Sequence, residues 1–135
     1  SQMYIYSNKQ ESPKDEIYES ESKVIRGLAS KGNCIIIGRC ADEVLRDRPN
    51  TVTVFLHAPE TNRRERIMKS ENLSEEEALH RIHKMDKRRS DHYSYYTRRI
   101  WGGAQNYDLT LDSSIGEDAV ISFIEEMMKQ KHISR

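Results

Sequence analysis

Three short β-rich runs, separated by longer segments of helical character, constrain the fold of this 135-residue chain more than any other feature. The runs are Cys34–Ile37, Thr51–His57 and Tyr107–Asp112. The first is apolar on both faces, which is typical of a strand covered on both sides in a parallel sheet. Because helical segments precede, separate and follow the runs, the order predicts an α/β fold with right-handed crossovers.

Capping patterns mark where several of the predicted helices begin. The patterns are Ser12 with Asp15, Ser74 with Glu77, and Ser114 with Glu117. Pro13 suits the first helical position, and Gly32 stands where a C-terminal glycine belongs. Apolar stripes at helical spacing predict the buried faces of the first and last helices. These stripes are Ile17, Val24, Ile25 and Leu28, and Val120, Ile121, Ile124, Met127 and Met128.

Charge is balanced overall but unevenly distributed along the chain. Lys plus Arg and Asp plus Glu both number 22, so the net charge predicts no polyanionic partner. Residues 81–99 nevertheless carry seven Lys or Arg against two acids. The two cysteines show no metal-site spacing and indicate a reducing compartment, which we take to be the cytoplasm. No apolar run approaches the roughly 18 residues of a membrane span, so no membrane partner is expected.

Polar residues follow each predicted strand, at the edge where open parallel sheets bind ligands. The three runs end at Gly38 and Arg39, at His57, and at Asp112 to Ser114. Gly38 allows the backbone to approach a ligand closely, and the planar guanidinium of Arg39 suits a phosphate or carboxylate. The alternative is that Arg39 only caps the sheet edge or pairs with Asp42.

Two clusters of cations lie on predicted helices. Arg63 and Arg66 are three residues apart, one turn beyond the end of the second run. In the basic segment 81–99, Asp86 could orient Arg89 or Lys87. Such clusters serve phosphoryl transfer or the binding of a nucleic-acid backbone, and a salt-bridged exposed helix is the alternative that needs no ligand.

The tyrosines of the basic segment, and the histidines at its start, raise two further functions: base stacking and metal binding. Tyr93, Tyr95 and Tyr96 could stack on bases, or they could pack the helix against its neighbour. His80 and His83 are three residues apart, a weak spacing for a metal, so we assign no metal to protein ligands. No nucleophile motif supports a hydrolase that forms a covalent intermediate.

Several blocks of the sequence together resemble the cytidylate kinase-like proteins, which are P-loop relatives of the nucleoside monophosphate kinases. The blocks are IIIGRCADEVL (35–45), VTVFLHAPETNRRERI (52–67), NLSEEEALHRIHKMDKRRSDHYSYYT (72–97), WGGAQNYDLTLDSS (101–114) and a closing amphipathic helix. They share one register from about Asp15 to Ile124. The resemblance implies a three-layer α/β/α P-loop NTPase fold over residues 1–135, with a lid-like helical segment at 72–103.

The resemblance also implies roles for individual residues. Arg39 would hold the acceptor phosphate, with Gly38 and Asp42 beside it; cytidylate kinases have Asp where this chain has Cys40. The nucleotide-binding residues would be Arg63, Arg66 and Ser113, and the catalytic residues of the lid would be Asp86, Arg88 and Arg89. The implied activity is transfer of a phosphoryl group from ATP, with Mg²⁺, to a nucleoside monophosphate, with CMP as the first candidate.

One feature of such kinases is missing from this sequence. They need a glycine-rich phosphate loop, and the six glycines (27, 32, 38, 102, 103 and 116) form none. We therefore expect the loop to lie upstream of Ser1 or to be missing from the chain, and we expect the 135 residues alone to be inactive. An open slot in the sheet would invite pairing with a second copy.

Two alternatives to an enzyme remain. A kinase-derived module could bind a nucleotide or phosphorylated metabolite without catalysis. A nucleic-acid binder using residues 81–99 would show steep salt dependence, but the neutral net charge favours small nucleotides as partners and no nucleic acid.

Overall fold

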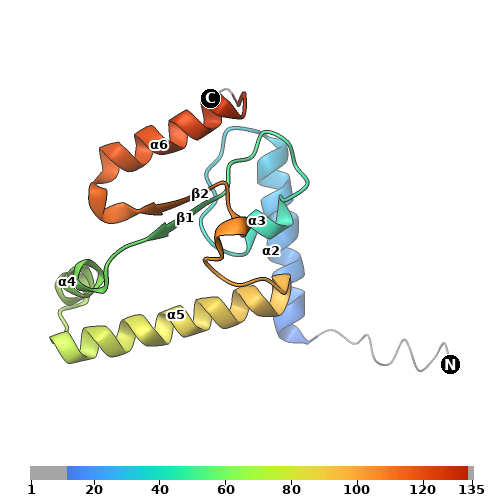
Figure 1. The fold of residues 1–135 in the computed structure, drawn as a ribbon. Helices are drawn as coiled ribbons and strands as arrows, with labels where there is room; N and C mark the ends of the chain where they lie inside the picture. The colour runs from blue at the N-terminus through green and yellow to red at the C-terminus, as the bar shows by residue number, and fades with distance from the viewer. Residues whose placement is uncertain (1–11, 134–135) are drawn as a thin grey trace. The chain divides into compact units, whose positions relative to one another are not determined.

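The structure is a computed structural model that describes residues 12–133 of a helix-rich α/β chain (Figure 1). Its elements are α2 (Pro13–Ser30), α3 (Ala41–Val44), β1 (Val54–His57), α4 (Glu60–Glu71), α5 (Glu75–Thr97), the 3-10 turn η1 (Ala104–Asn106), β2 (Leu109–Asp112), the 3-10 turn η2 (Ser113–Ile115) and α6 (Glu117–Gln130). The chain divides into two compact units, Ser1–Asp47 and Arg48–Arg135. We expected a single domain over residues 1–135. Whether the two units form one domain is not tested, so this stays a prediction.

The first unit is built on α2, whose predicted N-terminus is confirmed. The Ser12 hydroxyl accepts from the Asp15 amide, the Asp15 carboxylate accepts from the Ser12 amide, and Pro13 opens the helix. Its small core is formed by α2, α3 and the segment between them. The core residues are Ile25, Ala41 and Leu45, with Ala29, Ile36 and Val44 packed against them.

The predicted buried stripe of α2 is only partly correct. Ile25 is buried, but Ile17, Val24 and Leu28 are 59%, 61% and 44% exposed. The helix turns one narrow face toward α3, and that face centres on Ile25. The other apolar positions of the stripe therefore lie outside the core of this unit.

The predicted strand Cys34–Ile37 is wrong for the described chain, because these residues form no strand. Ile36 packs on the core around Ile25, whereas Ile35 and Ile37 are 93% and 88% exposed. Successive side chains of this segment thus point to opposite sides, as they do in extended backbone. No other part of the described chain pairs with this segment as a strand, and pairing is what defines a strand.

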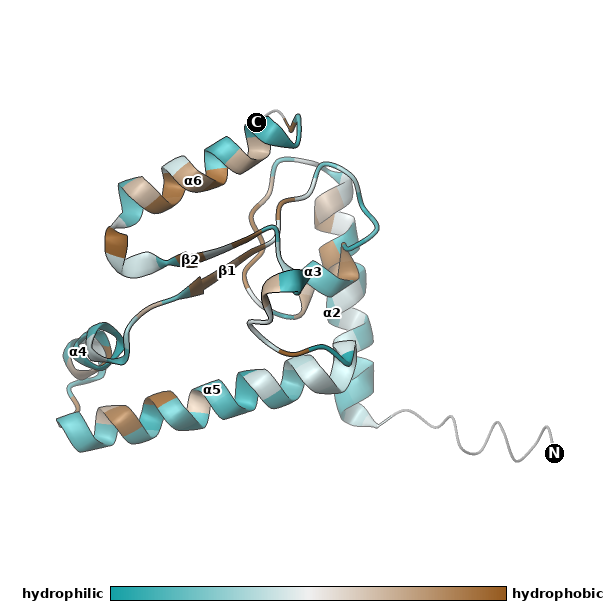
Figure 2. Cartoon of the chain, viewed as in Figure 1, coloured by the Kyte–Doolittle hydropathy of each residue, from teal (hydrophilic) through white to brown (hydrophobic). Residues whose placement is uncertain are grey.

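The second unit contains a sheet of two parallel strands, β1 and β2, which lie side by side in Figure 1. The register pairs Val54 with Leu109 and His57 with Asp112. The predicted parallel sheet is confirmed for the second and third runs, although each strand is shorter than its run. Figure 2 shows both strands as strongly hydrophobic, whereas α4 and α5 are mostly hydrophilic.

Aromatic side chains fix the loop before β2 to the sheet. The Phe55 ring packs edge-on against Trp101 and tilted against Tyr107, with ring centroids 5.2 Å apart in each pair. Gly102 lies under this ring with φ +78°, and a Cβ there would come 3.1 Å from the Phe55 ring. The Gly102 amide also donates to the Tyr107 hydroxyl at 3.3 Å. A glycine is therefore required at 102 by both backbone conformation and space.

A hydrogen-bond network at the start of the strands links α6 to the sheet. The Asp108 carboxylate accepts from the Thr53 amide at 2.8 Å and from Lys131 Nζ at 3.0 Å. Lys131 also donates to the Thr51 carbonyl at 2.7 Å. Burial opposes ionisation of Asp108, but the hydrogen bonds from Thr53 and Lys131 outweigh it and hold its pKa below the ordinary value.

The predicted cap of the last helix is wrong. The N-cap of α6 is Gly116, which provides no side-chain hydrogen bond. The Asp112 carboxylate instead accepts from the Ser114 amide at 2.9 Å and from its hydroxyl at 2.6 Å, which stabilises the turn η2. On α6, Val120 is buried as predicted, but Ile121 is 50% exposed.

Replacement of Gly102 by Ala tests the aromatic anchor. We expect Gly102→Ala to lower the free energy of unfolding by about 1–2 kcal/mol or more, because alanine is strained at this φ and meets the Phe55 ring. Gly27→Ala is the matched control. Gly27 lies in α2 with nothing within 4 Å of the added Cβ, so we expect a gain of about 0.5–1 kcal/mol. Urea denaturation measures both, and equal stability of the two variants would contradict the anchor.

Replacement of Asp108 by Asn tests the network at the strand starts. Because the folded-state pKa is depressed, the contribution of Asp108 is present above its unfolded pKa of about 3.9 and is lost as the pH falls through the folded pKa. We expect Asp108→Asn to cost about 1 kcal/mol at pH 7 and the gap from wild type to narrow as the pH falls below the unfolded pKa and through the lower folded pKa. Asp47→Asn is the control, because Asp47 forms no ion pair within residues 12–133. A gap between wild type and Asp108→Asn that stays constant through the acid range would contradict a contribution from the Asp108 carboxylate.

Candidate functional site

Polar groups gather at the carboxyl ends of β1 and β2, as the sequence predicts for two of its three runs. The register places His57 opposite Asp112. The Ser113 hydroxyl donates to the His57 carbonyl at 3.2 Å, which links the two strand ends. Hydrogen bonds from Ser114 and the nearby His57 lower the pKa of Asp112, so this edge carries a carboxylate at neutral pH.

The helix that follows this edge places Arg63 one turn beyond β1. Pro59 is the N-cap of α4, so the helix begins at Glu60, three residues after His57. Arg63 Nη1 donates to Asp86 Oδ2 at 2.8 Å, and Arg63 Nη2 donates to Asp86 Oδ1 at 2.6 Å. This is a two-point pair between α4 and α5, and it holds the pKa of Arg63 even above its usual value. Both side chains are about one third exposed or less (34% and 27%).

Asp86 lies between two arginines. Arg89 Nη1 lies 3.7 Å from Asp86 Oδ1, one turn along α5, so the predicted contact of Asp86 with Arg89 is present as an ion pair without a hydrogen bond. Lys87, the other predicted partner of Asp86, pairs with Asp91 at 2.7 Å instead. One carboxylate therefore serves two guanidinium groups, and the cluster Arg63–Asp86–Arg89 keeps a net positive charge.

Two further arginines of the same helices are uncompensated. Arg66 on α4 and Arg88 on α5 are exposed, and neither forms an ion pair with any residue between 12 and 133. The structure thus separates the predicted cations into two that contact Asp86 and two without an ion pair. Exposed guanidinium groups without an ion pair are available to an anionic ligand.

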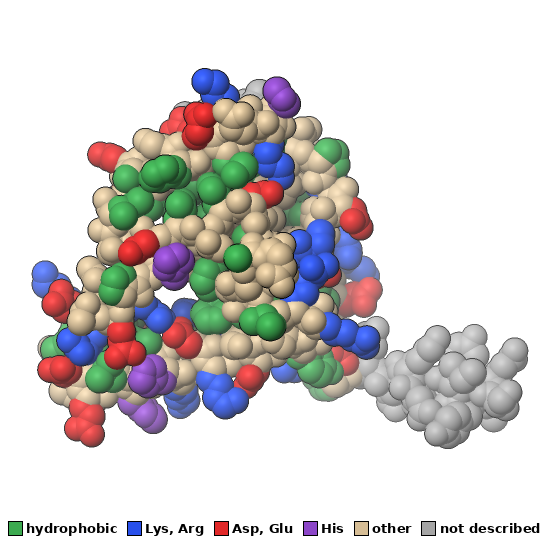
Figure 3. All heavy atoms as spheres, viewed as in Figure 1, with side chains coloured by type: hydrophobic (Ala, Val, Ile, Leu, Met, Phe, Trp, Pro, Cys, Tyr) green, Lys and Arg blue, Asp and Glu red, His purple; other side chains and the backbone are tan. Residues whose placement is uncertain are grey.

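Ion pairs at several points join α4 to α5, and Figure 3 shows charges of both signs interspersed over these helices. Besides Arg63 with Asp86, the pairs are Glu60 with His83 at 3.0 Å, Arg64 with Glu75 at 3.3 Å and Arg81 with Glu71 at 2.9 Å. The predicted capping box of Ser74 and Glu77 is confirmed at the start of α5. Because the other pairs are more exposed, the Asp86 pair is the main electrostatic link.

The far half of α5 is held by aromatic packing rather than by charge. Tyr93 is 4% exposed, and its ring stacks on Tyr107 at 6.4 Å. Tyr93 therefore packs the helix against its neighbour and is not a platform for a base. Tyr95 remains 57% exposed.

The predicted acceptor residues lie in the first unit, in a tight turn. Gly38, Arg39 and Cys40 all have left-handed backbone, with φ of 70°, 58° and 56°. For Arg39 and Cys40 this conformation is strained, which is often a feature of functional turns. Arg39 is 66% exposed on its side chain and lies 3.8 Å from Glu21 of α2, not paired with Asp42. Asp42 pairs with Arg46 at 3.3 Å.

Cys40, which replaces the family's Asp in the Gly-Arg-Asp pattern, is a buried free thiol. Burial, with the nearby acids Asp42, Glu21 and Glu43, raises its pKa to about 11. The thiol is therefore neutral at pH 7, so it cannot replace the charge of an aspartate.

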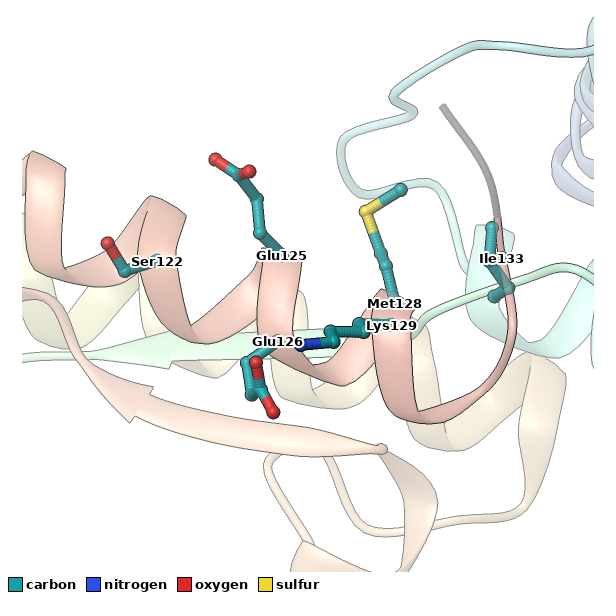
Figure 4. A pocket seen from close by; sticks show the side chains of 6 residues that line it. All are labelled: Ser122, Glu125, Glu126, Met128, Lys129 and Ile133. Atoms are coloured by element: carbon teal, nitrogen blue, oxygen red, sulfur yellow. The ribbon is translucent and has the colours of Figure 1, made fainter.

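A groove of ≈ 480 Å³ lies on α6 (Figure 4). It is lined by Ser122, Glu125, Glu126, Met128, Lys129 and Ile133. Glu125 and Glu126 point away from each other in Figure 4, so the polar groups do not converge on one point. No residue of the strand ends, α4 or α5 lines it, and we assign it no ligand.

The described residues contain neither a cluster of three metal ligands nor a membrane-spanning helix. Within 12–133, no three His, Cys, Asp or Glu side chains gather as ligands for a metal ion. In the same part of the chain, every helix is too short or too polar to cross a bilayer.

Two ion pairs of the predicted site arginines were not predicted from the sequence. The Arg63–Asp86 pair joins residues 23 apart, and the Arg39–Glu21 pair joins residues 18 apart. Neither separation has a local signature, because each depends on how one helix packs against its neighbour. The only signal in the sequence for these two pairs is that acidic residues occur on helices predicted to lie near the cations.

Comparison with known proteins places the chain in a family. The sequence profile of the cytidylate kinase-like family matches residues 1–115 of the chain. The crystal structure of an uncharacterized protein from Eubacterium ventriosum ATCC 27560 is similar, with a TM-score of 0.75 and 30% identity over 85% of this chain and 68% of that chain. No curated protein matches the sequence. The chain therefore belongs to the cytidylate kinase-like family, and this membership indicates a kinase-related function of the transferase type.

Neutralisation of Asp86 tests the central carboxylate. We expect Asp86→Asn to lower the free energy of unfolding by about 1–2 kcal/mol, because it leaves Arg63 and Arg89 without their acid. The matched control is Asp91→Asn on the same helix, whose partner Lys87 is 76% exposed, with an expected change below about 0.5 kcal/mol. Chemical denaturation at low and high salt measures both. If Asp86→Asn and Asp91→Asn lower the free energy of unfolding equally, Asp86 is not the main electrostatic link between α4 and α5.

Proposed function

We propose that the protein is a phosphotransferase that moves a phosphoryl group from ATP to a nucleoside monophosphate, with CMP as the first candidate. One observation carries the proposal: Asp86 binds Arg63 at two points and lies 3.7 Å from Arg89, on the helices α4 and α5 that also carry the exposed Arg66 and Arg88. Charge develops on the oxygens of a phosphoryl group during transfer, and fixed guanidinium groups stabilise it. Membership of the cytidylate kinase-like family supports the same reaction class.

Within this mechanism, Arg88 and Arg89 contact the transferred group, and Asp86 orients Arg89 and Arg63. Arg63 and Arg66 hold nucleotide phosphates near the carboxyl edge of the sheet, and Ser113 lies at that edge. A positioned arginine contributes about three or more orders of magnitude in rate to such reactions. The lid-like segment 72–103 would close over the phosphates when both substrates are bound.

Arg39 binds the acceptor phosphate in this proposal. Its guanidinium is largely exposed, and Gly38 allows the turn that presents it. Asp42 is already paired with Arg46, so its role is to support the turn. The neutral Cys40 thiol leaves the turn without the carboxylate that cytidylate kinases have there.

The proposed architecture is a three-layer α/β/α P-loop domain in which an additional strand carries the glycine-rich loop. The extended, apolar and unpaired segment Cys34–Ile37 supports it, because such an edge requires a partner strand. The described residues do not form a magnesium site, so Mg²⁺ would be carried by ATP and that loop. The two free cysteines fit a reducing cytoplasm.

A non-catalytic nucleotide-binding module is the second candidate. The neutral Cys40 favours it, because a family carboxylate is replaced by an uncharged thiol. The two candidates bind the same ligand and differ in turnover. A phosphoryl-transfer assay of a protein that includes the glycine-rich loop separates them.

Calorimetric titration of CMP, UMP and AMP tests acceptor binding. We expect Arg39→Ala to weaken CMP binding by about ten-fold or more, since a charge-assisted hydrogen bond to phosphate is lost. Arg48→Ala is the control, because it removes an arginine outside both clusters. We expect the 135 residues alone to bind CMP weakly and to show no transfer from ATP. Equal CMP binding by wild type and Arg39→Ala would remove Arg39 from the acceptor site.

A further inference from the structure

The surroundings of Arg39 are acidic, which is unexpected for a site that binds an anion. Glu21 Oε1 lies 3.8 Å from Arg39 Nη1, and the Glu21 side chain is 29% exposed. Asp42 and Glu43 follow on α3, where both pair with Arg46 at 3.3 Å and 2.9 Å. Asp42 and Glu43 thus have their own cation. Glu21 is left as the counter-ion of Arg39.

The distance between Glu21 and Arg39 decides what this pair can do. At 3.8 Å the two groups attract each other but form no hydrogen bond, so the guanidinium is neutralised without being held in a fixed orientation. A carboxylate that oriented Arg39 for a ligand would bind it at two points, as Asp86 binds Arg63 at 2.8 and 2.6 Å. The comparison of the two pairs within one chain indicates that Glu21 is a poor positioning group.

We propose that Glu21 is an autoinhibitory counter-ion, which a ligand phosphate must displace from Arg39. This inference rests on the proposed function, because it takes Arg39 as the phosphate-binding residue. A terminal phosphate carries about −1.5 to −2 charges at pH 7 and is repelled by the neighbouring carboxylate. Glu21 therefore weakens binding twice, first by its attraction for Arg39 and then by its repulsion of the phosphate. In the empty protein it weakens the binding of simple anions to Arg39.

The size of the effect of Glu21 on phosphate binding follows from how exposed the Arg39–Glu21 pair is. Two unit charges about 4 Å apart, in surroundings close to water, change an equilibrium constant by about five-fold. Because the phosphate is close to a dianion, neutralising Glu21 is expected to tighten phosphate binding by about three- to ten-fold. The gain falls as salt is added, since exposed charges are screened within about 10 Å at 0.1 M salt.

Glu21→Gln tests the inference, because it keeps the size of the side chain and removes its charge. The matched control is Glu19→Gln on the same helix, since Glu19 is exposed and forms no ion pair among the described residues. The ligands are CMP, inorganic phosphate and cytidine, titrated into the full 135-residue chain and followed by the NMR shifts of the Arg39 and Gly38 amides. The same titrations are made on Arg39→Ala and on the double variant with Glu21→Gln.

The expected result has three parts. Glu21→Gln tightens CMP and inorganic phosphate by about three- to ten-fold and leaves cytidine unchanged within two-fold, because cytidine lacks the phosphate. Glu19→Gln changes all three ligands less than two-fold. In the Arg39→Ala background, Glu21→Gln has little further effect, because the two residues act through one contact.

The failures of the two proposals are distinguishable. If Arg39→Ala weakens CMP binding but Glu21→Gln leaves it unchanged or weaker, the counter-ion role is wrong and the acceptor role of Arg39 stands. If Arg39→Ala binds CMP as tightly as wild type, the acceptor role fails and the inference fails with it. Absence of CMP binding by Glu21→Gln, or equal tightening by Glu19→Gln, also overturns the counter-ion role.

Discussion

The parallel pairing of β1 with β2 is the interaction on which the second unit depends. It sets His57 opposite Asp112 and so decides which polar groups meet at the carboxyl edge. It also places Thr53 beside Asp108, where Lys131 closes the network at the opposite end. The short, apolar strands explain why both ends need side-chain support, because two strands alone form a weak sheet. Phe55 supplies that support in the middle of β1 by anchoring the loop around Gly102.

The position of the cationic cluster follows from the same pairing. Helix α4 begins three residues after β1 ends, and Arg63 therefore lies close to the edge. The helix α5 is anchored at one half by Asp86 and at the other by Tyr93, so Arg88 and Arg89 lie on an element fixed on both sides. A rigid helix is a suitable carrier for charges that must meet a phosphoryl group with a defined geometry.

Local signals in the sequence were reliable, whereas packing between elements was not. The caps at Ser12 and Ser74 were predictable, because they depend on residues three positions apart. The cap at Ser114 failed because Asp112, two residues earlier, competes for the same groups. Cys34–Ile37 has the composition of a strand, but a strand also needs a partner, which composition cannot supply. For the same reason the cations of the candidate site were found and their acids, Glu21 and Asp86, were only partly assigned.

The two carboxylates that face predicted phosphate-binding arginines have different consequences. Asp86 is bound at two points and shared by Arg63 and Arg89, so the cluster stays positive and ordered. Glu21 faces Arg39 at 3.8 Å with no second cation beside it, so that pair is neutral and loose. If both groups of arginines bind phosphate as proposed, those of α4 and α5 are ready for an anion in the resting protein. Arg39 would bind an anion more weakly until its acid is displaced, and so would depend more on contacts that the rest of the ligand provides.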